Sequence, residues 1–153
     1  MMQAELDRQY MQQAIEQAQL AALAGEVPVG AVLVRDGQVI SKAFNKPITN
    51  HDPSAHAEML ALRQAADAEQ NYRLPGTTLY VTLEPCTMCA GAMLHARVDR
   101  IVYGAPDPKT GAAGSVVDVF ASKQINHQTS VNGGIMAEEC GQLLKTFFKR
   151  SEE

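Results

Sequence analysis

Residues 79–92 read LYVTLEPCTMCAGA, and this stretch decides which fold the chain can adopt. Its first half alternates aliphatic residues with tyrosine and threonine, which is typical of a β-strand. The strand pattern ends at Pro85, and the small residues that follow Cys86 predict a helix over 86–96. Because a strand that runs directly into a helix is half of a crossover unit, the stretch predicts an α/β fold.

The other segments of the chain supply the rest of that fold. Their spacing and turn residues predict a helix over 6–22, two antiparallel strands over 29–34 and 39–44, and a polar loop over 45–54. Asp52-Pro53 is a helix-start signal, and a helix is predicted to continue from it over 55–68. Further strands are predicted over 101–104 and 129–131, and a last helix over 136–149. Strands joined by crossover helices form a mixed sheet with helices on both faces, so we expect a three-layer α/β/α architecture.

Length and composition set the class of protein. The chain has 153 residues, of which 46% are hydrophobic, and this suits one compact core, so we predict a single domain over residues 1–153. Apolar runs are far shorter than the roughly 20 residues that a membrane-spanning helix needs. The first residues do not follow the pattern of a signal peptide, and the three cysteines are an odd number. We therefore expect a cytoplasmic protein with reduced thiols and no membrane partner.

The charge of the chain is unevenly distributed. The net charge of −4 argues against a uniformly basic nucleic-acid-binding surface. Residues 97–150, however, contain seven basic and five acidic residues and so carry a net charge of +2. This excess permits a local site for a polyanion but does not require one, since scattered solubilising charge has the same composition.

Cys86 and Cys89 lie three residues apart at the predicted start of a helix, where free N–H groups and the helix dipole favour thiolates. His56 lies 30 residues earlier, also near a predicted helix start. Two thiolates and one imidazole select Zn²⁺. By itself the Cys-x-x-Cys pair does not specify a catalytic metal site, because a redox pair or half of a structural zinc site has the same spacing. The sequence offers no second pair of ligands, and we assign the isolated Cys140 to the core.

Three protein ligands leave one position of a tetrahedral zinc ion free for water, whose pKa the metal lowers to about 7. Glu58 is the carboxylate nearest to His56 in the sequence, so we predict that it carries protons for the resulting hydroxide. Residues two apart on a regular helix point in different directions, so both side chains reach one site only from the end of the helix. Hydroxide and a glutamate together favour hydrolytic attack on an electrophilic carbon.

His-x-Glu followed by Pro-Cys-x-x-Cys resembles the motif of the zinc-dependent cytidine and deoxycytidylate deaminase superfamily. The stretches around it resemble the bacterial tRNA-specific adenosine deaminases in that superfamily. They are residues 25–32 (GEVPVGAV), Asn45, residues 51–53 (HDP), 79–92, 109–115 (KTGAAGS) and 147–148 (FF). The resemblance implies a cytidine-deaminase-like fold with a central mixed five-stranded sheet, one Zn²⁺ per subunit and a homodimer. It also implies hydroxide attack on C6 of the wobble adenosine in a tRNA anticodon stem-loop, with release of ammonia and formation of inosine.

The same resemblance implies roles for single residues. His56, Cys86 and Cys89 would hold zinc, Glu58 would move protons, Asn45 would hydrogen-bond the flipped nucleotide, Val29 and Pro85 would wall the base, Lys109 would contact phosphate, and Phe148 or its neighbour Phe147 would contact RNA. Asp107 has two interpretations, a hydrogen bond to a flanking nucleotide or a cap on its own loop.

Two other functions remain open from the sequence. One is a deaminase with the same chemistry that acts on free cytosine, guanine or a nucleotide, because the zinc motif specifies the reaction and not the base. The other is a protein without deaminase activity, either an RNA-binding module stabilised by zinc or a redox protein that uses Cys86 and Cys89.

Overall fold

The structure is a computed structural model that describes residues 2–125 and 127–151. Within these residues five strands form one mixed sheet in the order β2-β1-β3-β4-β5. The strands are β1 (Gly30–Arg35), β2 (Gln38–Phe44), β3 (Thr78–Leu83), β4 (Arg100–Ala105) and β5 (Ser130–Asn132). Strand β1 is antiparallel to β2 and β3, whereas β3, β4 and β5 are parallel. The predicted mixed five-stranded sheet is confirmed.

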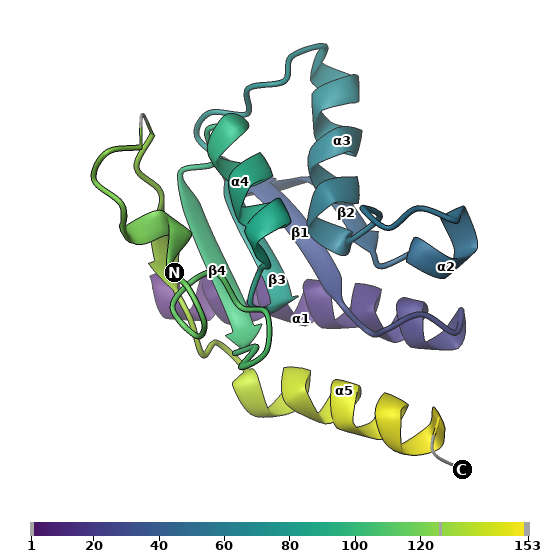
Figure 1. Cartoon of the computed structure of the whole chain (residues 1–153). Coiled ribbons are helices and arrows are strands. Elements are labelled where there is room, and N and C mark those ends of the chain that lie inside the picture. Colours follow the sequence, from purple (N-terminus) through teal and green to yellow (C-terminus); the bar gives the residue numbers. More distant parts are fainter. Residues whose placement is uncertain (1, 126, 152–153) are drawn as a thin grey trace.

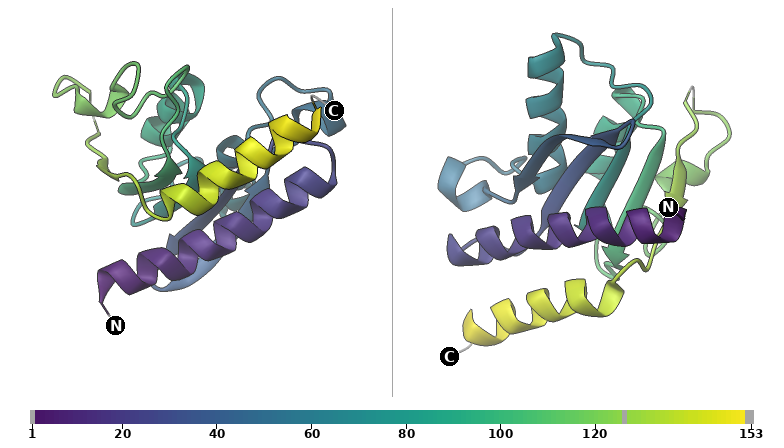
Figure 2. Two further views of the ribbon diagram at one scale, coloured as in Figure 1. Left: turned by 90° about the horizontal axis from the view of Figure 1, so that it is seen from below. Right: turned by 180° about the vertical axis from the view of Figure 1, so that it is seen from behind.

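Helices cover both faces of this sheet. Helices α3 (Ala57–Glu69) and α4 (Thr87–His95) lie on one face, and α1 (Gln3–Leu23) and α5 (Ala137–Ser151) lie on the other, as Figure 1 and the two views of Figure 2 show. Successive side chains of a strand point to opposite faces, so Ala31 and Leu33 pack toward α3 and α4, whereas Val32 and Val34 pack toward α1. This arrangement confirms the predicted three-layer α/β/α architecture.

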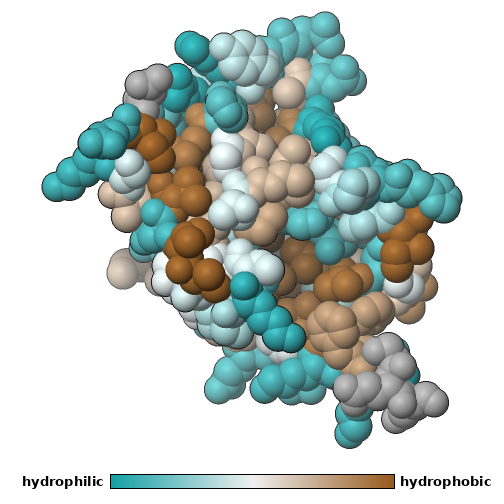
Figure 3. Space-filling model, viewed as in Figure 1, coloured by the Kyte–Doolittle hydropathy of each residue, from teal (hydrophilic) through white to brown (hydrophobic). Residues whose placement is uncertain are grey.

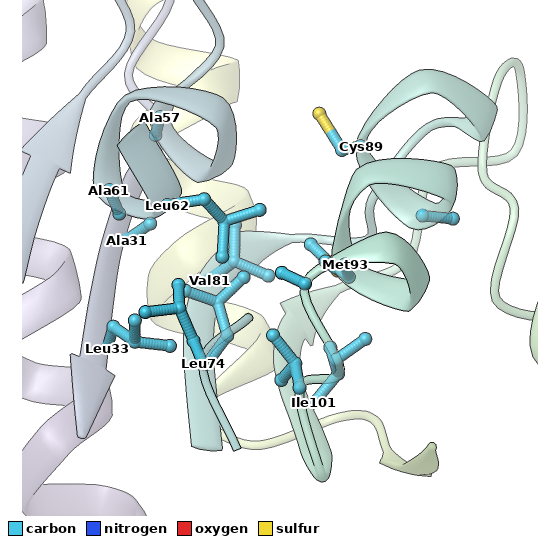
Figure 4. Close-up of a cluster of buried hydrophobic side chains, with 14 of the residues drawn as sticks. Ala31, Leu33, Ala57, Ala61, Leu62, Leu74, Val81, Cys89, Met93 and Ile101 are labelled. Atoms are coloured by element: carbon cyan, nitrogen blue, oxygen red, sulfur yellow. The ribbon is translucent and has the colours of Figure 1, made fainter. Parts of the chain in front are cut away.

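The apolar layer beneath α3 and α4 positions the site. Figure 4 shows Leu33, Val81 and Ile101 of the sheet directed toward Leu62 of α3 and Met93 of α4. All five side chains are buried, and their packing fixes the two helices relative to each other and to the sheet. The first turns of α3 and α4 therefore have a fixed position relative to each other.

The segment between β2 and α3 differs from the prediction. A short helix, α2 (Pro47–Asn50), lies in the stretch predicted as a loop, and α3 begins at Ala57 rather than at Pro53. The Asp52 carboxylate accepts hydrogen bonds from the backbone N–H and the hydroxyl of Ser54, at 2.9 and 2.8 Å. Asp52 thus closes a local turn before the helix and does not cap it, so that part of the prediction was wrong.

Beyond β4, the described residues include one more short helix. A short 3₁₀ helix, η1 (Val119–Ala121), lies between β4 and β5. Cys140 of α5 is buried beside Gly104 of β4, which confirms its assignment to the core. Over the described residues, no helix has both the length and the apolar character that a membrane span requires.

Candidate metal centre

His56, Cys86 and Cys89 converge in the structure. His56 Nδ1 lies 3.7 Å from Cys86 Sγ and 3.5 Å from Cys89 Sγ, and the three candidate ligand atoms lie within 4.8 Å of one another. Zinc bond lengths of about 2.3 Å to sulfur and about 2.0 Å to nitrogen, at a tetrahedral angle, place nitrogen and sulfur about 3.6 Å apart. The measured separations match this edge of the tetrahedron, so the residues fit Zn²⁺.

Two helix starts bring these ligands together. His56 and Cys86 each occupy the position before the first helical residue, of α3 and α4 respectively, and both have extended backbone conformations. Cys89 lies in the first turn of α4, and in Figure 4 its sulfur is on the side of α4 that faces α3. His56 precedes the first residue of α3, so the geometry of a regular helix does not apply to the pair His56 and Glu58. Their side chains are therefore not forced to point in opposite directions.

The environment of Glu58 changes its acidity. Its side chain is buried within the first turn of α3, and this burial raises its pKa to about 7. Its own backbone N–H, the neighbouring His56 and a hydrogen bond with Cys89 lower the pKa but do not offset the burial. A carboxyl group with this pKa can both take up and release a proton near neutral pH, which is what acid–base catalysis requires.

The ligand thiols have different acidities. A hydrogen bond from the Cys89 thiol, with further help from His56, lowers the pKa of Cys86 to about 4. The same contact with Cys86, together with burial, raises the pKa of Cys89. Cys86 is therefore a thiolate at neutral pH, the form in which cysteine binds metals.

Asn45 is hydrogen-bonded to the residue that follows His56, and Val29 is connected to Asn45 through the backbone. Asn45 Oδ1 accepts a hydrogen bond of 2.8 Å from the N–H of Ala57, the first residue of α3. The N–H of Asn45 donates to the carbonyl oxygen of Val29 at 3.1 Å. Asn45 thus caps α3 from a distant segment, a role that the sequence analysis missed because no local pattern connects positions 45 and 57.

Pro85 is buried next to the ligand Cys86, and the other three predicted residues form a second group at a hollow of about 390 Å³. Asp107, Lys109 and Phe148 line it together with Val27 and Leu83. Phe147 instead lines a groove between α1 and α5, so Phe148 is the phenylalanine that shares the hollow with Asp107 and Lys109. A contact between Phe148 and RNA stays a prediction.

Asp107 makes the contacts of a loop cap. Its Oδ1 accepts hydrogen bonds from the N–H groups of Lys109 and Thr110, and its Oδ2 accepts from the Thr110 hydroxyl. Burial opposes ionisation of Asp107, but these hydrogen bonds outweigh it and lower its pKa. The loop-capping interpretation is therefore observed directly, and a contact with a flanking nucleotide stays a prediction.

The fold and the three-ligand cluster define the class of zinc-dependent deaminases. The family model for the cytidine and deoxycytidylate deaminase zinc-binding region matches residues 4–105. The tRNA-specific adenosine deaminase of Haemophilus influenzae is 53% identical over 97% of this chain and 87% of its own length. That of Bacillus subtilis is 48% identical over 94% of this chain and 89% of its own length. The chain belongs to the family of tRNA-specific adenosine deaminases.

Solved structures agree with this assignment. A structure from a study of A-to-I editing by tRNA:A34 deaminases superposes with a TM-score of 0.86 at 45% identity, covering 89% of this chain and 99% of that one. A guanine deaminase from Bacillus subtilis gives a TM-score of 0.61 at 38% identity, covering 64% of this chain and 63% of that one. The greater coverage is with the tRNA deaminase.

Proposed function

We propose that this chain converts the adenosine at the wobble position of a tRNA anticodon to inosine, with release of ammonia. The observation that carries the proposal is a three-ligand cluster with zinc spacing beside the buried Glu58. The extensive similarity to tRNA-specific adenosine deaminases supports adenosine in tRNA as the substrate. One Zn²⁺ held by His56, Cys86 and Cys89 is the cofactor.

The residues of the chain then have distinct tasks. Zinc, when bound, supplies the Lewis acidity that makes water nucleophilic at neutral pH. In the hydrolysis the oxygen of a water molecule would add to C6 of adenine, the bond between C6 and the amino nitrogen would break, and that nitrogen would leave as ammonia. Glu58 accepts a proton from the attacking water and delivers it to the departing nitrogen, a role for which a pKa of about 7 is suited.

The base is held by residues beside the ligands. Val29 and Pro85 are buried next to the cluster and provide apolar walls. The oxygen of the Asn45 side chain is used by Ala57, so its amide nitrogen is the half that we assign to the nucleotide. The target base must leave its stack to reach this depth, and an anticodon loop lowers that cost because its bases are unpaired.

We expect the tRNA strand to pass over the group formed by Asp107, Lys109 and Phe148. Lys109 is exposed and is placed to contact a phosphate, and Phe148, with half of its surface exposed, offers an aromatic face to a base. Asp107 shapes this loop, and we keep a hydrogen bond to a flanking nucleotide as its second role. The anticodon stem-loop is therefore the part of tRNA that we expect the protein to bind.

We also propose that the protein acts as a homodimer in the cytoplasm. The face that carries α3 and α4 has an apolar hollow of about 290 Å³, lined in part by Met59, Leu62 and Tyr72. Figure 3 shows further apolar side chains on the loop after β4, where Val116 and Val117 are exposed. Sedimentation equilibrium tests the dimer, and a single species at monomer mass would contradict it.

Mapping of inosine tests the reaction. The zinc-loaded protein is incubated with unmodified tRNA that has adenosine at the wobble position, and inosine is located by sequencing. A tRNA that has guanosine at this position is the matched control and should remain unchanged. Ammonia release from free guanine or cytosine with none from tRNA would favour a free-base deaminase. No ammonia from any of these substrates would favour a non-catalytic zinc module or a redox protein.

A further inference from the structure

Glu84 is a buried carboxylate without an assigned role that immediately precedes the turn bearing the metal ligands. It is 2% exposed and lies between the last residue of β3, Leu83, and Pro85. Its Oε1 accepts a hydrogen bond from the N–H of Asp107 at 3.0 Å, and its Oε2 accepts from the N–H groups of Ala113 and Ser115 at 2.9 and 3.1 Å. The Ser115 hydroxyl donates to Oε1 as well. One side chain therefore gathers four donors from a single loop.

The loop over residues 106–115 is shaped around this carboxylate. The N–H of Ala112 donates to the carbonyl oxygen of Pro85 at 2.8 Å, which docks the loop on the turn before Cys86. A Cβ at Gly111 would lie 2.5 Å from both Glu84 Cδ and the Asp107 carbonyl oxygen, so no side chain fits there. The loop thus closes tightly on Glu84, and its first half contains Asp107 and Lys109.

We infer that Glu84 is a positioning residue that holds the 106–115 loop at a fixed distance from the metal centre and so orients the tRNA strand that enters the site. The inference rests on the proposed function, because it assigns the strand to Asp107 and Lys109. Glu84 is connected through Pro85 to the ligand Cys86 and through hydrogen bonds to the loop. Movement of the loop relative to the metal is therefore limited by the Glu84 side chain together with the hydrogen bond from Ala112 to Pro85.

Only a carboxylate satisfies this arrangement. Four donors require a group that accepts on both oxygens and donates on neither. In Glu84→Gln the amide oxygen fits best at the Oε2 position, where it faces the N–H groups of Ala113 and Ser115. The amide nitrogen then faces the Ser115 hydroxyl and the Asp107 N–H. The hydroxyl can rotate and accept a hydrogen bond from the amide, whereas the Asp107 N–H can only donate and so loses its partner. The substitution is thus expected to break the hydrogen bond at Asp107 and to keep the hydrogen bonds at Ala113 and Ser115.

The experiment compares Glu84→Gln with Asp7→Asn in the zinc-loaded protein. Asp7 is also a buried carboxylate, at 3% exposed, and accepts hydrogen bonds from Arg100, Tyr80 and Gln3, but it lies on α1 on the opposite face of the sheet. Both variants replace a carboxylate with an amide and lose hydrogen bonds, so both should lower the melting temperature. Zinc content, amide hydrogen exchange, and kcat and KM on an anticodon stem-loop are measured for each.

We expect Glu84→Gln to keep its zinc, to exchange the amide of Asp107 faster, and to raise KM about tenfold, the effect of losing one charge-assisted hydrogen bond. Its kcat should change less than KM, and Asp7→Asn should retain both constants. Ser115→Ala, which removes only the hydroxyl contact, should shift KM in the same direction by less, and it replaces Glu84→Gln should that variant not fold.

The outcomes separate the two proposals. A wild-type protein that makes no inosine would contradict the proposed function and this inference with it. Editing by the wild type with equal KM values for Glu84→Gln and Asp7→Asn would overturn the inference alone. Loss of zinc from Glu84→Gln would also overturn it, because the carboxylate would then support the metal centre and not the loop.

Discussion

Replacement of Glu58 by glutamine tests the proposed chemistry most directly, because the amide has the shape of the protonated acid but cannot transfer its proton. Proton transfer by a positioned side chain contributes about 10²- to 10⁴-fold to rate, so inosine formation by Glu58→Gln should fall by that factor. Glu58 is not among the ligand cluster, so the variant should retain one zinc per chain. Single-turnover inosine formation and elemental analysis measure the two quantities.

The burial of Glu58 also predicts a stability effect in zinc-free protein. A pKa raised from 4.5 to about 7 by burial means that the folded chain binds a proton that the unfolded chain has released between these pH values. Stability of the wild type therefore falls as pH rises through this window, and Glu58→Gln avoids the loss. The variant should gain about 3 kcal/mol in free energy of unfolding at pH 8, and less than about 1 kcal/mol at pH 5.

Urea unfolding of zinc-free wild type and variant at the two pH values provides this comparison. Glu16→Gln, the same change at an exposed position of α1, is the matched control and should alter neither stability nor activity. Editing within tenfold of wild type would refute the role of Glu58 as the proton carrier. An equal stability difference at pH 5 and pH 8 would refute the explanation of its raised pKa by burial.

Three other predictions concern the metal, the acid stability and the RNA contacts. Cys89→Ser should lose zinc and melt at a lower temperature, since ligand loss couples to folding, and unchanged zinc by elemental analysis would contradict the ligand assignment. Hydrogen bonds from Arg100, Tyr80 and Gln3 outweigh burial and lower the pKa of Asp7, so its contribution to stability is present above its ordinary pKa of 3.8 and disappears as the pH falls. Asp7→Asn should therefore lose less stability than wild type between pH 5 and pH 2, measured by thermal unfolding. Affinity for the anticodon stem-loop should fall steeply with salt, and Lys109→Ala should reduce the slope of log affinity against log salt by about one if this lysine contacts phosphate.

The parts of the fold that follow from local patterns were predictable. The alternation in residues 79–83 and the small residues after Cys86 indicated β3 and α4, and the structure has both. The metal ligands were also predictable because the residue types alone restrict the chemistry, even though 30 residues separate His56 from Cys86. The place of Cys86 and Cys89 at the start of α4 follows from the helix predicted there, whereas α3 begins later than its Asp52-Pro53 signal indicated.

The contacts that hold the site in shape were not predictable from local patterns. Asn45 caps α3 across 12 residues, and Glu84 binds donors 23 to 31 residues away, so neither leaves a period or a motif in the sequence. The Asp52-Pro53 pair was a misleading signal, since the aspartate used its carboxylate on Ser54 two residues later. In each case a side-chain oxygen could accept a hydrogen bond from several backbone N–H groups. Which of these groups lies within hydrogen-bond distance depends on the folded structure.

A comparison of three buried glutamates shows how the fold makes one of them reactive. Glu26, Glu58 and Glu84 are 1%, 4% and 2% exposed, so burial alone does not distinguish them. Burial opposes ionisation of Glu26 and Glu84, but hydrogen bonds from backbone and hydroxyl groups outweigh it and lower their pKa values. Glu58 has less such compensation, and its pKa rises to about 7. Glu26 and Glu84 are fixed anions that hold α2 and the 106–115 loop, whereas Glu58 can exchange a proton because the chain gives its charge fewer donors.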